Sequence, residues 1–368
     1  MDDPFSAALP RELARRGVGR AYVLMSGHLH RDDEILTTLE DALGERLVGI
    51  FSGLPQHSPL PDVLDAAREA KALNCDILIS IGGGSSIDAA KLVQHCLTLG
   101  AFELEPLLAS RTDKARSRQR GTVAHIAVPT TLSGAEFTYF AGGRNPTTLL
   151  KEAFFAPDLL PRTVIFDQHL ATRTPQRLWL SSGLRAMDHA LEGLMSGRDH
   201  ALSHVLALEG IRRLRTALPA TQAYPGDLSA RRQSQFGGWF CSVGLMSGVP
   251  MGASHAIGHV IGSLFDVPHG LTSCIALPAV IAYNYRAGDP LFDEIAQALG
   301  GTRGSEAPDL LRGFITSLGL PTSMTELGLG RDRFDAIARG TLHESWAGTN
   351  PRPLTSPDEV IAILEAML

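Results

Sequence analysis

Short apolar runs that alternate with helical patterns fill the first part of the chain, and they constrain the fold most. The strand-like runs lie at 21–25, 46–51, 76–81, 125–130 and 163–167. A helical pattern over 6–17 precedes them, and patterns over 33–45, 61–73 and from GGGSSIDAAK (82–91) to about Leu99 lie between them. Strands joined through helices pair in parallel and are covered on both faces. The pattern therefore predicts an α/β fold with a parallel sheet between two layers of helices.

The strand-like runs stop near residue 170, and long helical patterns replace them. These patterns lie at 176–196, 200–217, 228–247, 252–264, 271–287, 290–299, 306–318, 331–341 and 357–367. A chain of 368 residues is longer than one typical core supports. We therefore predict a Rossmann-like dinucleotide-binding α/β domain over 1–170 and an all-helical domain over 171–368.

A glycine-rich turn, with glycines at 82–84, joins the run at 76–81 to the helix after it. Glycines let the backbone approach a phosphate, and the N–H groups that start a helix favour an anion. Ser85 can cap the helix or donate a hydrogen bond, and Asp88 is expected in the first helical turn, where the dipole favours a carboxylate. The turn is neither G-x-G-x-x-G nor a P-loop, so an ordinary tight turn is the alternative to a dinucleotide site.

A second polar turn, PTTLSGAEFT (129–138), follows the next predicted strand. Thr130, Thr131 and Ser133 offer hydroxyl groups at the carboxyl end of a parallel strand, where α/β sheets bind ligands. Such hydroxyls are also common in turns without a ligand. Together with the glycine-rich turn, they are predicted to line one cofactor site.

The stretch MGASHAIGHVIGSLFDVPHG (251–270) concentrates histidines. His255 and His259 are four residues apart, so they share one face of a helix. Pro268 cannot continue that helix, and His269 is expected to return beside it after a turn. Converging imidazoles suit a metal site or proton transfer, whereas polar positions on an ordinary amphipathic helix are the alternative.

The composition argues against several partners. The net charge is -6 without a basic run, which disfavours a nucleic acid or an anionic membrane as partner. No apolar run is long enough to span a bilayer, and the N-terminus lacks the apolar segment of a secretory signal. The 4 cysteines are scattered, which predicts free thiols in a reducing cytoplasm.

Three motifs, GGGSSIDAAK (82–91), PTTLSGAEFT (129–138) and HAIGHVIGSLFDVPHG (255–270), resemble the iron-containing (group III) alcohol dehydrogenase superfamily. The resemblance runs from about residue 10 to 368 and implies a dinucleotide domain followed by a helical domain. It also implies cofactor contacts: a pyrophosphate site, hydroxyls along the cofactor and a lysine near its ribose. The pyrophosphate site corresponds to Gly83, Gly84 and Ser85. The hydroxyls are those of Thr130, Thr131 and Ser133, and the lysine is Lys151.

The resemblance also assigns roles to the histidines. His189, His255 and His269 match the positions of metal ligands, and His259 matches the histidine beside the nicotinamide, a candidate for proton transfer. Metal-dependent members carry an Asp ligand four residues before the first of these histidines. Arg185 occupies that position here, and a guanidinium has no lone pair for a metal.

Two interpretations of Arg185 follow. It can supply fixed positive charge for an acidic substrate, or it can pair with Asp188 or Glu192 on its own helix. Around the helix axis, we expect Asp188 to lie about 100° from the face that would carry metal ligands. Its carboxylate is therefore expected to point outward and form a salt bridge there. Maleylacetate reductases, a branch of the superfamily, also lack the Asp and reduce an enone acid with NADH or NADPH without a metal. That branch typically has Asn at the position, and DVPHGLTS (266–273) is closer to the alcohol dehydrogenase version.

We therefore predict a metal-independent, NAD(P)H-dependent reductase of an unsaturated or oxo acid, with a small anionic substrate. Arg185, His189, His255, His259 and His269 are the candidate catalytic side chains, and His259 or His255 delivers the proton. Ser26 stands where NAD-selective members carry an acidic residue, so both NADH and NADPH are permitted. A homodimer is expected, although the N-terminal strand pair of the family is missing.

Other functions remain open. A divalent-metal (Fe or Zn) alcohol dehydrogenase would use His189, His255 and His269 as ligands, and sensitivity to chelators would reveal it. A lyase or cyclase resembling dehydroquinate synthase would use NAD without consuming NADH. A cofactor-binding protein whose site has decayed is the non-catalytic alternative.

Overall fold

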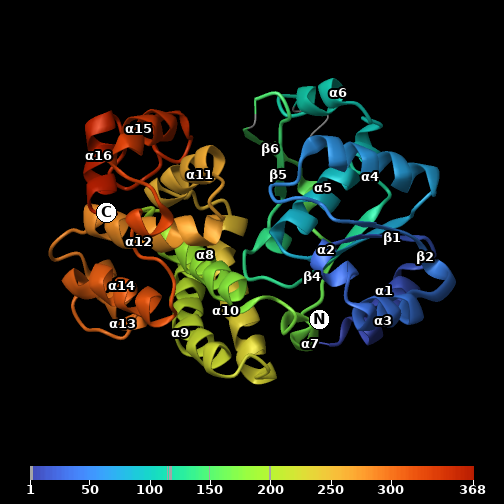
Figure 1. The fold of residues 1–368 in the computed structure, drawn as a ribbon, viewed down its shortest axis with the longest axis horizontal. Helices are drawn as coiled ribbons and strands as arrows, with labels where there is room; N and C mark the ends of the chain where they lie inside the picture. The colour runs from blue at the N-terminus through green and yellow to red at the C-terminus, as the bar shows by residue number, and fades with distance from the viewer. Residues whose placement is uncertain (1–2, 114, 116–117, 149, 199) are drawn as a thin grey trace. The chain divides into compact units, whose positions relative to one another are not determined.

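The computed structural model describes residues 3–113, 115, 118–148, 150–198 and 200–368, and they form two compact units that divide between Thr174 and Pro175 (Figure 1). The predicted boundary, between residues 170 and 171, falls close to this division. The first unit has the mixture of strands and helices that the sequence predicts, and the second unit is helical, as predicted.

The first unit is built on a five-stranded sheet of order β2-β1-β3-β4-β7, in which every pair is parallel. The strands are β1 (Ala21–Met25), β2 (Leu47–Ser52), β3 (Ile77–Gly82), β4 (Ala124–Pro129) and β7 (Thr163–Val164). The predicted strands agree with these to within a residue or two, except at 163–167, where the strand ends after Val164. The predicted parallel sheet is therefore confirmed.

Helices cover both faces of this sheet because its strands are apolar on both faces. On β1, Ala21, Val23 and Met25 pack into one core with α1 (Phe5–Arg16), α2 (Gly27–His30), α3 (Asp33–Leu43) and α7 (Gln168–Ala171). Tyr22 and Leu24 point the opposite way. They pack against α4 (Leu60–Ala72), α5 (Gly84–Leu99) and α6 (Leu104–Ala109).

An antiparallel hairpin, β5 (Phe140–Arg144) and β6 (Lys151–Phe155), follows the second polar turn. Neither strand was predicted. FAGGR has two glycines, which disfavour a strand, and KEAFF is only partly apolar. The hairpin forms because Ala141 and Phe154 pack into the core beneath α4 and α5.

The second unit is helical throughout its described residues. Its helices are α8 (Gln176–Met195), α9 (Ala201–Ala223), α10 (Leu228–Met246), α11 (Ala253–Phe265), α12 (His269–Asn284), α13 (Pro290–Ala298), α14 (Ala307–Ser317), α15 (Phe334–His343) and α16 (Pro357–Glu365). Asp266 adopts the left-handed conformation, with φ 54°, and ends α11; Pro268 then precedes α12. His269 is therefore the first residue of α12, two positions before the predicted start at 271.

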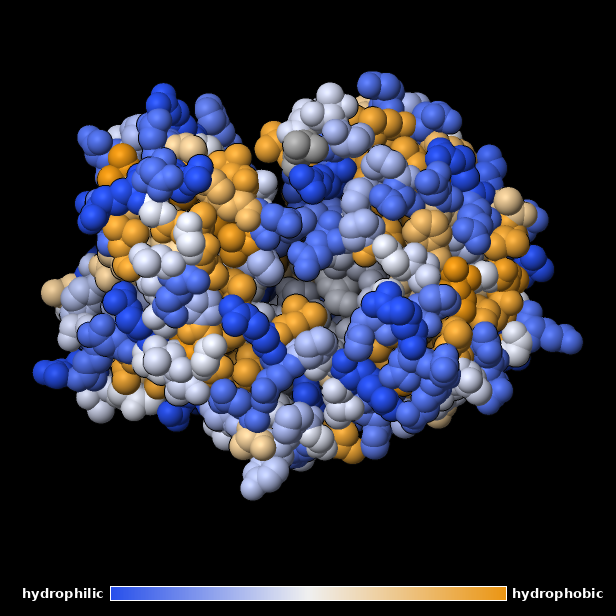
Figure 2. All heavy atoms as spheres, viewed as in Figure 1, coloured by the Kyte–Doolittle hydropathy of each residue, from blue (hydrophilic) through white to orange (hydrophobic). Residues whose placement is uncertain are grey.

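The surfaces of both units agree with the composition. Figure 2 shows hydrophilic side chains over much of the viewed face of each unit, with apolar side chains scattered among them. Among the described residues, no helix is long and apolar enough to cross a membrane. Cys75, Cys96, Cys241 and Cys274 are buried free thiols, as predicted.

Candidate active site

The two polar turns of the first unit lie against each other at the carboxyl edge of the sheet. A Cβ added at Gly83 would lie 3.0 Å from Thr131 Cγ2, and one at Gly84 would lie 3.0 Å from Ser133 Oγ. Thr131 Oγ1 and Ser133 Oγ are 3.2 Å apart. The missing side-chain carbons let Thr131 and Ser133 pack against the backbone at the start of α5, and this cradle of hydroxyls and helix N–H groups fits a dinucleotide pyrophosphate.

Three more predicted cofactor residues surround this cradle. Ser26 follows β1, and its N–H donates to Ile81 O at 3.0 Å. The Thr130 N–H donates to Gly82 O at 2.9 Å. Ser85 Oγ accepts the N–H of His57 at 3.3 Å. The first two hydrogen bonds hold the ends of β1, β3 and β4 at one edge, and the third joins the loop at His57 to α5.

The loop that approaches Ser85 was not singled out from the sequence. His57 and Ser58 have φ values of 67° and 48°, in the left-handed region that non-glycine residues seldom adopt. The Ser58 hydroxyl donates to Ser85 O at 2.9 Å. Strained backbone of this kind concentrates at ligand sites, but a sequence pattern does not reveal it.

Asp88 and Lys151 lie away from the first turn of α5. The helix begins at Gly84, so Asp88 is one full turn inside it, and the prediction of a first-turn carboxylate is wrong. Asp88 Oδ2 accepts the Gly142 N–H at 3.3 Å and lies 3.2 Å from Lys151 Nζ. Asp88 thus anchors the β5–β6 hairpin, while an approach of Lys151 to the cofactor ribose stays a prediction.

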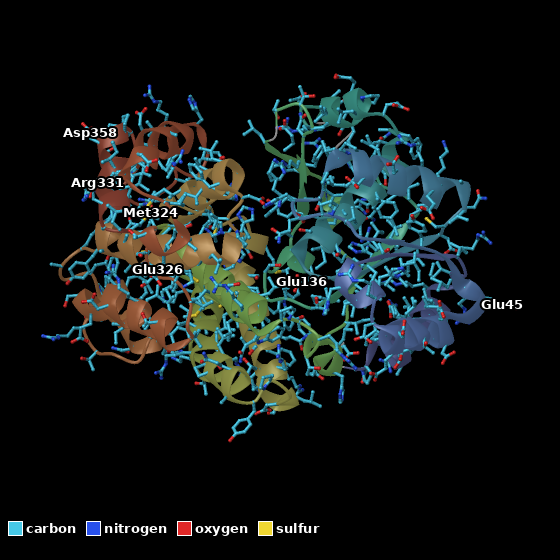
Figure 3. All side chains as sticks on the ribbon, in the orientation of Figure 1. Glu45, Glu136, Met324, Glu326, Arg331 and Asp358 are labelled. Atoms are coloured by element: carbon cyan, nitrogen blue, oxygen red, sulfur yellow. The ribbon has the colours of Figure 1, made fainter. Side chains whose placement is uncertain are left out.

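Lys91 is a buried residue that sequence reasoning missed. Its ammonium donates to Ala135 O (2.5 Å), Thr138 O (2.7 Å), Thr138 Oγ1 (2.9 Å) and Phe140 O (2.9 Å). Burial lowers the pKa of Lys91 to about 8 and raises the pKa of nearby Glu136, labelled in Figure 3, to about 7. The lysine fixes the end of the second polar turn and the start of β5.

In the second unit, Arg185 on α8 is buried with a carboxylate partner. Its Nη1 lies 3.4 Å from Asp188 Oδ2 and donates to Ser273 Oγ at 3.2 Å. Asp188 Oδ2 also accepts the hydroxyls of Ser254 (3.0 Å) and Ser273 (2.6 Å). Burial lowers the pKa of Arg185, and the charges of Asp188 and Glu192 oppose that shift.

The predicted outward direction of Asp188 is therefore wrong. Asp188 is fully buried, at 0% exposure. Residues three apart on a helix are neighbours, so position 188 lies beside position 185 on the inward face. Burial raises the pKa of Asp188, and Arg185 is the largest influence that lowers it.

Glu192 fixes the orientation of His255. Its carboxylate accepts the N–H groups of Gly252 (2.9 Å) and Ser254 (2.6 Å) and lies 2.7 Å from His255 Nδ1. Burial and Asp188 raise the pKa of Glu192, which the backbone donors oppose. Burial lowers the pKa of His255, so the ring is neutral, and its buried Nε2 has no hydrogen-bond partner among the described residues.

The other histidines extend this cluster. The rings of His189 and His255 are 5.0 Å apart, and those of His259 and His269 are 5.5 Å apart. Burial, and next the charge of Arg185, lower the pKa of His189. A Cβ on Gly262 would lie 3.1 Å from the His269 ring, so this glycine gives the ring its space after the turn.

Two residues after α15 complete the surroundings of His259, and the sequence did not indicate them. His259 Nδ1 lies 3.3 Å from Glu344 Oε2. The Trp346 ring is 4.9 Å from His259 and 5.4 Å from His255. Their positions follow from packing over a long sequence separation, which no local pattern records.

The ligand atoms of the alternative metal site do not lie together as one compact group. Within the described part of the chain, the ligand atoms that lie within 4.8 Å of one another belong to Asp188, Glu192 and His255. The three histidines His189, His255 and His269 do not form such a group.

Family models match both units. Residues 6–168 match the iron-containing alcohol dehydrogenase model, and residues 179–368 match the C-terminal model of the Fe-containing alcohol dehydrogenase family.

Relatives with known names agree with these matches. The chain is 31% identical to a maleylacetate reductase of Rhizobium sp. (strain MTP-10005), over 95% of this chain and 89% of that one. It is 32% identical to the maleylacetate reductase of Burkholderia cepacia, over 97% and 91%. The crystal structure of maleylacetate reductase from Agrobacterium tumefaciens superposes with a TM-score of 0.82 at 29% identity, over 100% and 95% of the chains.

The glycine cradle of the first unit and the buried histidines of the second agree with these similarities. The chain belongs to the iron-containing alcohol dehydrogenase family of oxidoreductases, on its maleylacetate reductase-like branch.

Proposed function

We propose that this enzyme is a metal-independent reductase that uses NADH or NADPH to reduce an unsaturated or oxo acid similar to maleylacetate. The observation that supports it most is the buried guanidinium of Arg185, held by Asp188 beside His189 and His255. The names of the relatives at about 30% identity support the same class of substrate.

Arg185 makes the buried cluster unfit for a divalent ion. Asp188 Oδ2 takes hydrogen bonds from Ser254 and Ser273 and lies 3.4 Å from Arg185 Nη1, the fixed positive charge that an ion bound there would face. Two unit charges about 4 Å apart interact by roughly 4 kcal/mol at an effective dielectric near 20, so repulsion of a dication would be about twice that. We assign no step to a metal.

The guanidinium is suited to an acidic substrate. Among the described residues, the side-chain hydrogen bonds of Arg185 go through Nη1. Nε and Nη2 are left for a carboxylate, which a guanidinium binds with two parallel hydrogen bonds. A fixed positive charge also stabilises the negative charge that develops on an enolate or alkoxide oxygen.

The cradle formed by Gly83, Gly84, Thr131 and Ser133 would hold the dinucleotide pyrophosphate. Bound there, NADH or NADPH would supply the hydride. The side chains of the cradle bind and orient the cofactor and take no part in proton transfer.

His259 is the proposed proton donor. Its Nδ1 faces Glu344, which orients the ring and favours a proton on Nδ1, while Trp346 packs on the ring. His255 is the second candidate from the sequence, but Glu192 holds its Nδ1 and burial lowers its pKa, so its Nε2 is suited to accept a hydrogen bond and not to supply the proton. An imidazole exchanges a proton near neutral pH, as this step requires.

A substrate panel tests the proposal. Oxo and enone dicarboxylic acids, their methyl esters and simple aldehydes are offered with NADH and with NADPH, and the loss of nicotinamide absorbance is followed. We expect the acids to have a kcat/KM roughly tenfold or more above that of their esters, since a charged hydrogen bond is lost in the ester.

Two results would contradict it. A preference for simple aldehydes would support the alcohol dehydrogenase alternative. Product formation without consumption of reduced nicotinamide would support the lyase alternative.

A further inference from the structure

The topological switch point of the first unit lies between β1 and β3. The helix α3, which connects β1 to β2, packs on one face of the sheet, whereas α4 and α5 pack on the other. The strand order therefore reverses between β1 and β3, and open α/β sheets bind ligands at the carboxyl ends of the strands at such a point.

Ser26 and Gly27 directly follow β1 at this switch point. A Cβ on Gly82 would lie 3.2 Å from Ser26 Cβ, so Ser26 touches the glycine-rich turn. A Cβ on Gly27 would lie 3.2 Å from Gly53 Cα, so the ends of β1 and β2 also meet closely. A nucleotide with its pyrophosphate at the glycine turn and its adenosine toward β1 would pass over Ser26 and Gly27.

Arg31 lies beside this surface. A Cβ on Gly27 would lie 3.4 Å from Arg31 Nη1. The Arg31 side chain is exposed and has no hydrogen-bond or ion-pair partner among the described residues. The guanidinium is therefore available to a ligand.

A second arginine offsets part of the negative charge that follows Arg31. Of the three acidic residues at 32–34, Arg173 pairs with Asp32 at 3.2 Å and Glu34 at 2.5 Å, and Asp33 is the third. The segment 26–30, SGHLH, contains no acidic residue. In dinucleotide-binding folds a carboxylate receives the ribose 2′-hydroxyl of NAD, whereas an arginine accommodates the 2′-phosphate of NADP.

We propose that Arg31 binds the 2′-phosphate of NADPH and makes the nucleotide site selective for NADPH over NADH. This inference rests on the proposed function, because it requires a dinucleotide at the glycine-rich turn. Arg31 acts on one phosphate group and has no part in the chemistry at the nicotinamide.

Equilibrium binding of NADP⁺ and NAD⁺ without substrate, measured by calorimetry, tests this directly because the two differ only in the 2′-phosphate. We expect the wild type to bind NADP⁺ more tightly. Arg31→Ala should weaken NADP⁺ binding by roughly tenfold, the loss of one charge-assisted contact, and leave NAD⁺ binding within about twofold. Arg31→Lys keeps the charge but loses the paired N–H donors of the guanidinium. Its affinity for NADP⁺ should therefore lie between those of the wild type and Arg31→Ala.

Arg46→Ala is the matched control. Arg46 is an exposed arginine directly before β2, at the amino ends of the strands, whereas Arg31 lies beyond the carboxyl end of β1. Its removal should change neither the NADP⁺ nor the NAD⁺ affinity. An unchanged ratio of NADP⁺ to NAD⁺ affinity in Arg31→Ala, or equal weakening of both, would overturn the role of Arg31 and leave the proposed function intact. If the wild type bound neither nucleotide, the proposed function would fail with it.

Discussion

Arg185 and Asp188 are opposite charges buried on one helix, and each lowers the free-energy cost of burying the other. The carboxylate also accepts two serine hydroxyls, so its charge is compensated by three donors. A buried ion pair contributes little net stability, but removing one partner is costly because a lone charge remains.

Unfolding of single and double variants tests this balance. Arg185→Met should destabilise the second unit by about 3 kcal/mol, and Arg185→Met with Asp188→Leu should recover most of that loss. Trp179, Trp239 and Trp346 all lie in the second unit, so tryptophan fluorescence during urea unfolding reports on it. A double variant as unstable as the single one would show that the pair is not coupled.

Glu344 is expected to act through His259. Glu344→Gln keeps the shape but removes the charge that orients the imidazole, so kcat should fall by roughly tenfold, with KM little changed. Steady-state kinetics with the best acid of the panel measures this. Asp335→Asn, which removes an exposed carboxylate on α15, is the control and should leave kcat unchanged. A rise in KM alone would instead assign Glu344 to substrate binding.

Local patterns predicted most elements of this chain but not every side-chain direction. The strands of the sheet and the return of His269 after Pro268 follow from rules that act over a few residues. The β5–β6 hairpin depends on packing against α4 and α5, and Glu344 and Trp346 reach the histidines from distant sequence. Asp188 was placed wrongly because its serine and arginine partners come from three helices.

Glu12 joins two elements of the first unit, α1 and β7. It is buried, and its carboxylate binds Arg15 (2.6 Å), Arg16 (2.7 Å) and Thr163 (2.7 Å). The hydrogen bond from Arg15 contributes most to lowering the pKa of Glu12 to about 2, from 4.5. Because the folded pKa lies below the unfolded one, the stabilisation is full above pH 4.5 and is lost as the pH falls toward 2.

We therefore predict that Glu12→Gln destabilises the protein by about 1–2 kcal/mol at pH 7, after allowing for the solvent exposure of Arg15. The difference from wild type should shrink steadily below pH 4.5. Thermal unfolding of both proteins at pH 7 and pH 3 measures it. An equal difference at both pH values would show that the charge of Glu12 is not its cause.

At the scale of the whole molecule, each unit carries a different part of the proposed chemistry. ADP at about 100 times its Kd should stabilise the folded, ADP-binding state by roughly 2.7 kcal/mol. Hydrogen exchange should slow in β3, the start of α5 and residues 130–133, and a dicarboxylate should instead slow exchange in α8, α11 and α12. Protection of the same segments by both ligands would contradict this division.

The homodimer expected from the family resemblance stays a prediction. Sedimentation equilibrium should give twice the mass of one chain. A monomer that retains full activity would show that neither unit needs a second copy.

The proposed mechanism depends on a guanidinium acting where metal-dependent relatives use an ion. The most direct measurement is the kcat/KM for an enone dicarboxylic acid after treatment with a chelator, with iron and zinc quantified in the same sample. We predict unchanged kcat/KM at metal contents far below one ion per chain. Loss of activity on chelation, with recovery on addition of zinc or iron, would contradict it.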